Sequence, residues 1–215
     1  MSRRPLDFRA APLRGQMEAW TLDAFSRRIH RQHGDHKAAV LGRLEGTVVE
    51  LGPGTGANMR YYPPGVHVIG IEPNPAMHPR LRAKADRLGV NLEIRTIRGE
   101  QLDADDASAD AVIGTLVLCS VHDPQGVVAE IQRVLRPRGT YFFLEHVAAP
   151  RGTFTRRLQS WVKRPVRWMF NGCEVDRDTG ALLGEAGFAD IALTEIDTGP
   201  ADAYVRHRIV GVATN

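Results

Sequence analysis

Five short apolar runs after Gly46 constrain the fold more than any other feature of the sequence. In chain order they read "TVVEL", "VHVIGIE", "NLEIRTI", "ADAVIGTLVL" and "TYFFLEHV". Near-continuous apolar and β-branched runs of this length are typical of strands buried on both faces. Segments with helical spacing separate several of the runs, so the sequence predicts a doubly wound α/β fold in which helices cover both faces of a parallel sheet.

The clearest of these helical segments is "PQGVVAEIQRVLR". Asp123 is the expected N-cap, and Pro124 suits the first helical position because its missing N–H is not needed there. The expected buried stripe of this helix comprises Val127, Val128, Ile131, Val134 and Leu135.

Both ends of the chain depart from this alternation. From Gln16 onward apolar residues recur every three to four positions, which predicts an amphipathic helix that stops at Gly34 and precedes a second short helix. The Arg- and Pro-rich residues 1–15 are expected to form a loose arm. At the other end a helix closes near Gly187, and "DIALTEI" and "YVRHRIVGV" follow with too short a link for a crossover, so we predict an antiparallel last pair of strands.

The length and composition limit the domain organisation. A chain of 215 residues with 43% apolar residues can build one sizeable core, so we predict one structural domain, with an arm and cap helices over residues 1–45 and the main α/β unit over 46–215. Proline and charge interrupt the basic start, and no run reaches about 18 apolar residues, so we expect neither a signal peptide nor a membrane-spanning helix.

The cysteines and the basic clusters are less specific. Cys119 and Cys173 show no metal-ligand spacing, which predicts no metal site and fits a reducing, cytoplasmic location. Lys and Arg exceed Asp and Glu by 28 to 25, with clusters at "RRIHRQHGDHK" and "RRLQSWVKRPVR". We interpret these clusters as solvated faces, with anionic lipid or nucleic acid as the alternative partner.

A glycine loop follows the first predicted strand. Gly52, Gly54 and Gly56 allow a ligand to approach the backbone, although with Ala57 they also satisfy the dinucleotide pattern. Glu50 at the end of that strand favours a cofactor that carries an ammonium and a sulfonium over a pyrophosphate. Glu72 ends the second strand, where an acid accepts the two ribose hydroxyls of a nucleoside.

These segments resemble the class I S-adenosylmethionine-dependent methyltransferases from Gly46 to about Val212. "VVELGPGTG" looks like the family's first motif, "VIGIEPNP" like its acidic second strand, and "RVLRPRGTYFFLEH" like its helix-to-fifth-strand segment. With "YYPPG", "TLVLCSV" and "NGC", the chain most resembles the methyltransferase-like 7 proteins, which methylate alkyl thiols. The resemblance implies a seven-stranded Rossmann-like sheet. In this chain Arg138 stands where glycine is usual.

The resemblance also implies a cofactor site for S-adenosylmethionine. Its expected residues lie in the loop after the first strand, after the second and third strands, and at the floor after the fourth: Glu50, Gly52, Pro53, Gly54, Thr55, Gly56, Asn58, Glu72, Pro73, Asn74, Gly99, Glu100, Gln101, Thr115, Leu116 and Val117.

Methyl transfer is an in-line displacement, so the protein mainly has to position two reactants and exclude water. His146 and His122, each following a strand at the catalytic end, are candidate bases, and local hydrogen bonding is the alternative for both. Several side chains are expected to form a lid for a small lipophilic acceptor: Trp20, Phe25, Trp161, Trp168, Met169, Phe170 and Cys173. Core packing is the alternative for Trp161, Trp168, Met169 and Phe170.

The acceptor stays open in the sequence. A thiol fits the resemblance best, and the alternatives are O- or N-methylation of a phenol, quinol or phospholipid amine. A nicotinamide-dependent reductase is disfavoured because there is no Tyr-x-x-x-Lys motif. A non-catalytic RNA- or cofactor-binding module is the alternative of another class. We expect no nucleic-acid partner, and the basic and aromatic segment allows peripheral contact with a membrane.

Overall fold

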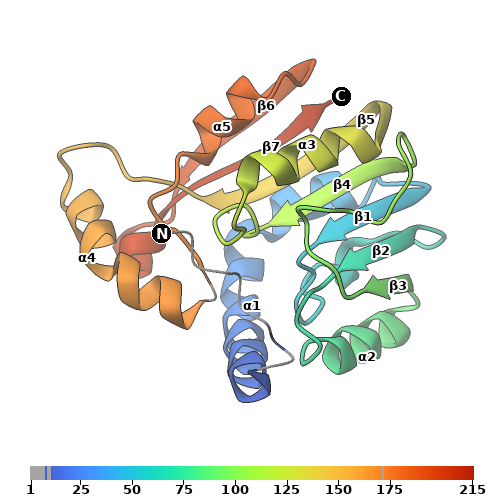
Figure 1. Cartoon of the computed structure of the whole chain (residues 1–215), viewed down its shortest axis with the longest axis horizontal. Helices are drawn as coiled ribbons and strands as arrows, with labels where there is room; N and C mark the ends of the chain where they lie inside the picture. The colour runs from blue at the N-terminus through green and yellow to red at the C-terminus, as the bar shows by residue number, and fades with distance from the viewer. Residues whose placement is uncertain (1–7, 9–10, 171) are drawn as a thin grey trace.

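A computed structural model describes residues 8, 11–170 and 172–215. Its centre is a seven-stranded sheet in the order β3-β2-β1-β4-β5-β7-β6 (Figure 1). The strands are β1 Thr47–Leu51, β2 His67–Ile71, β3 Asn91–Arg95, β4 Ala109–Thr115, β5 Leu135–His146, β6 Asp190–Asp197 and β7 His207–Thr214. β1 to β5 pair in parallel, and β7 pairs antiparallel with both β5 and β6, which confirms the predicted fold class and the antiparallel last pair.

Helices cover both faces of the sheet. The helices are α1 Pro12–Leu41, α2 His78–Leu88, α3 Pro124–Val134, α4 Phe154–Met169 and α5 Thr179–Glu185, with short 3₁₀ helices η1 Met59–Tyr61 and η2 Pro200–Val205. α3 and α5 lie on one face of the sheet and α1 and α2 on the other (Figure 1). α4 lies beyond the carboxyl ends of the parallel strands, which we call the carboxyl edge of the sheet. Asp123 accepts a hydrogen bond from the Gly126 amide, so the predicted N-cap of α3 is confirmed.

The core divides into two layers because successive residues of a strand point to opposite faces. Val49 faces a cluster that contains Val127, Val128, Ile131 and Val134 of α3 and Leu183 of α5. Val48 faces the other cluster, which contains Leu41 of α1 and Leu81 of α2. Each fully buried aliphatic side chain of this kind stabilises the fold by about 1.5–3 kcal/mol.

The prediction that the first helix stops at Gly34 is wrong. α1 runs as one helix from Pro12 to Leu41, so the predicted loose arm also ends earlier than expected; its other residues lie outside the described ones, apart from Phe8 and Ala11. A Cβ at position 34 would lie 3.1 Å from His30 Nδ1 and 3.5 Å from the Tyr61 hydroxyl. Glycine therefore lets the helix pack against the contact between His30 and Tyr61, which offsets its cost of about 1 kcal/mol in a helix.

Several residues of the first basic cluster, "RRIHRQHGDHK", are buried or form contacts within the protein. Arg28 bonds to the carboxylate of Asp202 at 2.7 Å, and Lys37 is buried. His33 is also buried beside Arg208 of β7, and burial together with that guanidinium lowers the pKa of His33 to about 4. These contacts dock the second half of α1 on the sheet, so the interpretation of this cluster as a solvated face holds only for its exposed residues.

Arg138, which the family resemblance places where glycine is usual, lies within β5, in the stretch where the pairing with β4 changes register. Its φ is +66°, in the left-handed region that glycine adopts without steric cost. A glycine at this position would meet that backbone requirement without cost, whereas arginine occupies the position under strain.

None of the helices among the described residues is both long enough and apolar enough to cross a membrane. The division at residues 45 and 46 stays a prediction.

Candidate active site

The glycine loop lies at the carboxyl ends of β1 and β2, where open α/β sheets bind ligands. Gly52, Gly54 and Gly56 all have positive φ, at +58°, +56° and +81°. A Cβ at Gly52 would lie 2.9 Å from Val117 Cγ2, so the loop fits closely against the residue that follows β4. Gly52 itself is exposed, whereas Pro53, Gly54, Thr55 and Gly56 are buried. The backbone of the loop is thus accessible at Gly52, and the rest of the loop is packed against the protein.

Glu72 holds this loop to the turn after β2. Its side-chain oxygens accept hydrogen bonds from the amides of Gly54 at 2.9 Å and Asn74 at 2.8 Å. Burial raises the pKa of Glu72 to about 7, against these two bonds, and the like charges of Glu18 and Glu50 raise it further. Each carboxylate oxygen still has a free acceptor position, so Glu72 fits the predicted role of binding two hydroxyl groups.

Glu50 lies under the loop in a buried polar cluster. Its carboxylate accepts bonds from Asn58 Nδ2 and the Tyr62 hydroxyl, each at 2.8 Å. Lys37 donates to Asn58 Oδ1 at 2.9 Å, and burial lowers the pKa of Lys37 to about 8. Asn58 also donates to Thr115 Oγ1 at the end of β4. Glu50 therefore supplies negative charge under the loop while it orients Asn58, and its direct contact with the cofactor stays a prediction.

The first half of α1 covers the same edge of the sheet. Asn74 Nδ2 donates to the Gly15 carbonyl at 3.1 Å and to Glu18 Oε2 at 3.2 Å, and Thr55 donates to Asp23 Oδ1 at 3.2 Å. Burial raises the pKa of Glu18 to about 7. With Glu50 and Glu72, Glu18 makes this edge acidic. The sequence analysis missed Glu18, since periodicity on α1 does not show which residue will face the loop.

The segments predicted for the adenine end also come together. Gly99, Glu100 and Gln101 form a turn after β3, and Pro73 is half-buried beside Asn74. The Glu100 carboxylate accepts a bond from the His122 amide at 3.1 Å. This contact joins the turn after β3 to the segment after β4 and leaves the imidazole of His122 exposed.

The residues after β4 are held in an unusual conformation. Leu116 has a φ of +59°, although it is not glycine. Glu145, which is fully buried on β5, accepts hydrogen bonds from the amides of Val117, Leu118 and Cys119 at 2.9, 2.9 and 3.2 Å. Burial raises the pKa of Glu145 to about 7. Glu145 was missed because its position in an apolar strand gives no sign that loop amides lie above it.

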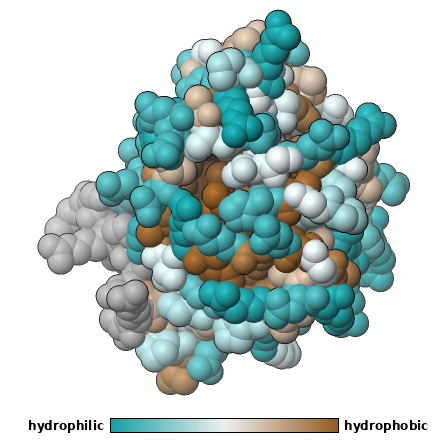
Figure 2. All heavy atoms as spheres, turned by 90° about the vertical axis from the view of Figure 1, so that its right-hand side faces the viewer, coloured by the Kyte–Doolittle hydropathy of each residue, from teal (hydrophilic) through white to brown (hydrophobic). Residues whose placement is uncertain are grey.

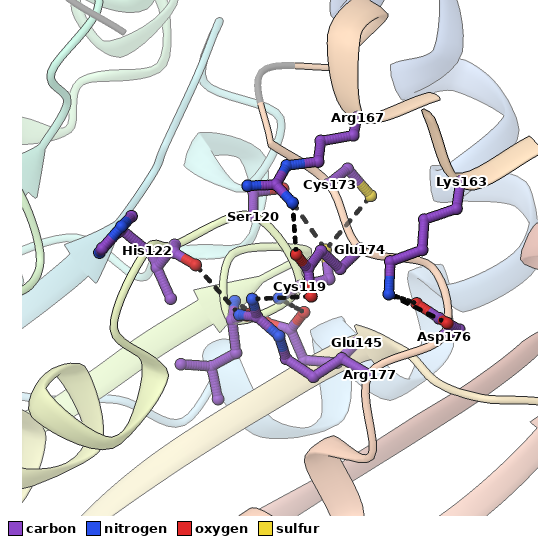
Figure 3. A network of polar contacts seen from close by, with 12 residues as sticks. Cys119, Ser120, His122, Glu145, Lys163, Arg167, Cys173, Glu174, Asp176 and Arg177 are labelled. Carbon is purple, nitrogen blue, oxygen red and sulfur yellow. Dashed lines mark hydrogen bonds and ion pairs between the residues drawn. The ribbon is translucent and has the colours of Figure 1, made fainter. Parts of the chain in front are cut away.

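His146 ends β5 next to both cysteines. The Sγ atoms of Cys119 and Cys173 lie 3.8 Å apart, and a ring nitrogen of His146 lies with them within 4.8 Å. The close contacts of the Cys173 thiol with Cys119 and His146 lower the pKa of Cys173, against its burial. Figure 3 shows the His122 ring turned away from this group, so the structure favours His146 of the two candidate bases.

Of the predicted lid residues, Cys173 is buried and Phe170 is half-buried, whereas the other five are exposed. Phe25 of α1 and Phe170 after α4 meet edge to face at 6.4 Å, and the Arg14 guanidinium lies 5.5 Å from the Trp168 ring centre. Cys173 is buried in an apolar cluster against which Phe170 also packs. Trp161 is 83% exposed, and Trp20, Trp168 and Met169 are also exposed. The core-packing alternative is therefore wrong for Trp161, Trp168 and Met169, and the expected lining role of Trp161 finds no support.

A cavity of about 540 Å³ lies at the amino ends of β1 and β2, opposite the glycine loop, between Thr47, His67, Leu102 and Arg133. Figure 2 shows that side of the molecule, with apolar residues visible in a band between hydrophilic ones. The amino ends of the parallel strands lie there (Figure 1), so this cavity is not at the edge where the glycine loop and the acids gather.

Comparisons with known proteins agree with this geometry. The sequence model of a methyltransferase domain matches residues 49–143. The chain is 36% identical over 179 residues to human thiol S-methyltransferase TMT1A, covering 82% of this chain and 72% of that protein. It is 38% identical over 152 residues to rat thiol S-methyltransferase TMT1B, covering 69% of this chain and 62% of that protein, which is under two thirds of its length.

Solved structures show the same fold at lower sequence identity. Geranyl diphosphate C-methyltransferase from Streptomyces coelicolor superimposes with a TM-score of 0.69 at 16% identity, over 87% of this chain and 76% of that one. That structure contains S-adenosyl-L-homocysteine. The [4+2]-cyclase SpnF gives a TM-score of 0.67 at 18% identity, over 84% of this chain and 78% of that one.

The acidic edge fits a cofactor that is cationic at one end and a nucleoside at the other. Glu18 and Glu50, the charged groups that raise the pKa of Glu72, are both negative when ionised. The three carboxylates would therefore repel a pyrophosphate and attract a sulfonium or an ammonium. The free acceptor positions of Glu72 suit ribose hydroxyls. The chain belongs to the class I S-adenosylmethionine-dependent methyltransferases, in the family that includes the TMT1 proteins.

Proposed function

We propose that this methyltransferase transfers the methyl group to the sulfur of a small lipophilic thiol. The observation that carries the proposal is its 36% identity over 179 residues to human thiol S-methyltransferase TMT1A. The geometry at the end of β5 supports it, because one histidine at the site is enough for a thiol. A thiol with a pKa of about 8.5 needs only a modest push to ionise near neutral pH.

In this mechanism S-adenosylmethionine supplies a methyl group that its sulfonium has already activated. Glu72 binds the ribose, and Glu18 and Glu50 favour the positive end. The first half of α1 excludes water from the edge, since it lies over the glycine loop. His146 accepts the proton of the thiol, and the contact between α1 and the end of α4 covers the acceptor.

Matched acceptors test the proposal. Benzyl mercaptan, benzyl alcohol and benzylamine present a sulfur, an oxygen and a nitrogen on the same apolar group, and release of S-adenosylhomocysteine reports turnover. We expect turnover with the thiol and at most trace turnover with the others. Turnover confined to the alcohol or the amine would reject the thiol acceptor and leave the methyltransferase assignment standing.

We also propose peripheral contact with anionic membranes through α4. Phe154, Trp161 and Trp168 recur every seven residues on one side of α4 and are 78%, 83% and 66% exposed. The exposed Arg157 and Arg164 lie between them in sequence, at helical spacing along the same side. Aromatic side chains interleaved with cations are typical of helices that lie in a lipid interface, where each cation near an anionic surface contributes about 1 kcal/mol.

Vesicle sedimentation tests this contact. The unmodified protein should sediment with phosphatidylglycerol-containing vesicles more than with neutral phosphatidylcholine vesicles, and W161S/W168S should lose most of that binding. Leu88→Ser removes another exposed apolar side chain, on α2, and serves as the matched control. Equal binding by the double variant and the control would reject this surface.

The proposed cellular location is the cytoplasm, supported by two cysteines that stay unpaired.

A further inference from the structure

Cys119, His146 and Cys173 form a group that the sequence spacing did not predict. Cys119 lies in the turn after β4, His146 ends β5, and Cys173 lies in the segment after α4. Their possible ligand atoms, two sulfurs and one imidazole nitrogen, all lie within 4.8 Å of one another. From this geometry we infer that the three side chains bind one Zn²⁺ ion, with a fourth coordination position open. The sequence prediction of no metal site rested on linear spacing, which does not show that the three segments converge.

The distance between the sulfurs fits tetrahedral zinc. Two sulfurs that each lie about 2.3 Å from a tetrahedral ion are about 3.8 Å apart, and the two Sγ atoms are 3.8 Å apart here. A disulfide would require the sulfurs to approach to about 2.05 Å. Two cysteines and one histidine with an open position are a known donor set for zinc.

His146 supplies a second, independent observation. Its Nδ1 atom is buried and has no hydrogen-bond partner among the described residues. A buried polar nitrogen without a partner costs free energy, which a bound cation would recover. Cys119 and Cys173 are 1% and 6% exposed, so both sulfur donors lie out of bulk water, and His146 is half-buried beside them.

The surroundings hold the two cysteines in place. The Cys119 amide donates to Glu145, and the Cys119 carbonyl accepts a bond from the Glu174 amide at 2.7 Å. The Cys173 amide donates to the Phe170 carbonyl at 3.1 Å. Val166 and Val175 pack on the cysteines and make a dry shell, and Figure 3 shows Cys119 and Cys173 facing each other inside this network. Outer contacts of this kind orient metal ligands.

Metal binding and proton transfer by His146 would exclude each other, so the base of the proposed mechanism is His146 of the metal-free protein. The imidazole is no longer a free base while it coordinates an ion, and both thiols must release their protons to bind zinc. The ion would also join the turn after β4, the end of β5 and the segment after α4, so it should stabilise the folded protein.

Cobalt substitution tests the site without any need for turnover. The protein is purified without an affinity tag, reduced, stripped with a chelator and titrated with Co²⁺. The chain has only two cysteines, so a thiolate-to-cobalt charge-transfer band must come from Cys119 and Cys173. We expect one Co²⁺ per chain, displacement by Zn²⁺, and loss of the band in Cys119→Ser and Cys173→Ser. His146→Gln should weaken binding by more than about tenfold.

His67→Gln is the matched control, because His67 lies at the start of β2, on the opposite edge, and the variant should bind like the unmodified protein. A second readout uses the unmodified protein alone: Zn²⁺ should protect both thiols from a disulfide reagent and raise the melting temperature. Absence of stoichiometric binding would overturn the proposal. So would a thiol pair that reacts at the same rate with and without Zn²⁺, or that is recovered only as a disulfide.

Discussion

At the scale of single residues, the site depends on buried carboxylates that have few positively charged side chains near them. Glu72 accepts hydrogen bonds from two backbone amides. The like charges of Glu18 and Glu50 nevertheless disfavour the ionised form of Glu72 until a cationic cofactor binds. The acids of the glycine loop were predictable from sequence because they directly follow strands. Glu18 and Glu145 were not, since each acts through a contact with a segment distant in the chain.

Substitution of Glu72 separates cofactor binding from chemistry. Glu72→Ala removes a charged acceptor of hydrogen bonds, worth about 1.5–3 kcal/mol, so the Kd for S-adenosylmethionine should rise by about 10- to 100-fold. His146→Ala should leave this Kd within about twofold and lower kcat. Isothermal titration and initial rates measure the two effects; equal losses of affinity in both variants would contradict the assigned roles.

The pKa of Glu72 predicts how the affinity for the cofactor depends on pH. Burial raises this pKa to about 7 in the free protein, and the bound cofactor favours the carboxylate, so binding should tighten as the pH rises through 7. Between pH 6 and 8 the ionised fraction of such a group rises by about tenfold, and Kd should fall by about the same factor. Glu18→Gln removes a like charge and should shift the profile to lower pH. A flat profile in the unmodified protein would contradict this reading of the site.

At the scale of elements, one buried polar side chain, Gln159, links α4 to several backbone groups of the segments it packs on. Gln159 is fully buried and accepts a bond from the Ala149 amide at 2.9 Å. Its Nε2, which carries two N–H groups, lies 3.1, 2.9 and 3.0 Å from the carbonyl oxygens of Val147, Val175 and Tyr204. It therefore joins α4 to the end of β5, to the segment that carries Cys173 and to η2. Nothing in the local sequence marked Gln159, because a lone glutamine in a basic helix is typical of a solvated face.

Replacement of this glutamine should loosen the whole element. Gln159→Leu leaves several buried backbone groups without partners, so the free energy of unfolding should fall by about 2–4 kcal/mol. Urea denaturation measures the change. Ser160→Ala, at the exposed neighbouring position, should change it by less than about 0.5 kcal/mol. A loss for Gln159→Leu no larger than for the control would show that α4 is held by its apolar contacts alone.

At the scale of the whole molecule, the parallel sheet and its antiparallel last pair followed from the sequence, and the position of α1 did not. Apolar runs separated by helices predict a parallel sheet, and the short final link requires an antiparallel pair, both of which the structure confirms. Periodicity showed that α1 is amphipathic. It could not show that one continuous helix docks by its second half on β7 and covers the glycine loop with its first half, because those contacts depend on Arg208, Asn74 and Thr55 far along the chain.

Hydrogen–deuterium exchange with and without S-adenosylhomocysteine is the measurement that tests the central claim most directly. If the acidic edge holds the cofactor, binding should slow exchange in residues 52–58, 72–76 and 99–101 and in the first half of α1. The opposite edge, around Thr47, His67 and Leu102, should show no change. Protection confined to that opposite edge, or no protection at the glycine loop despite measurable binding, would contradict the site described for this methyltransferase.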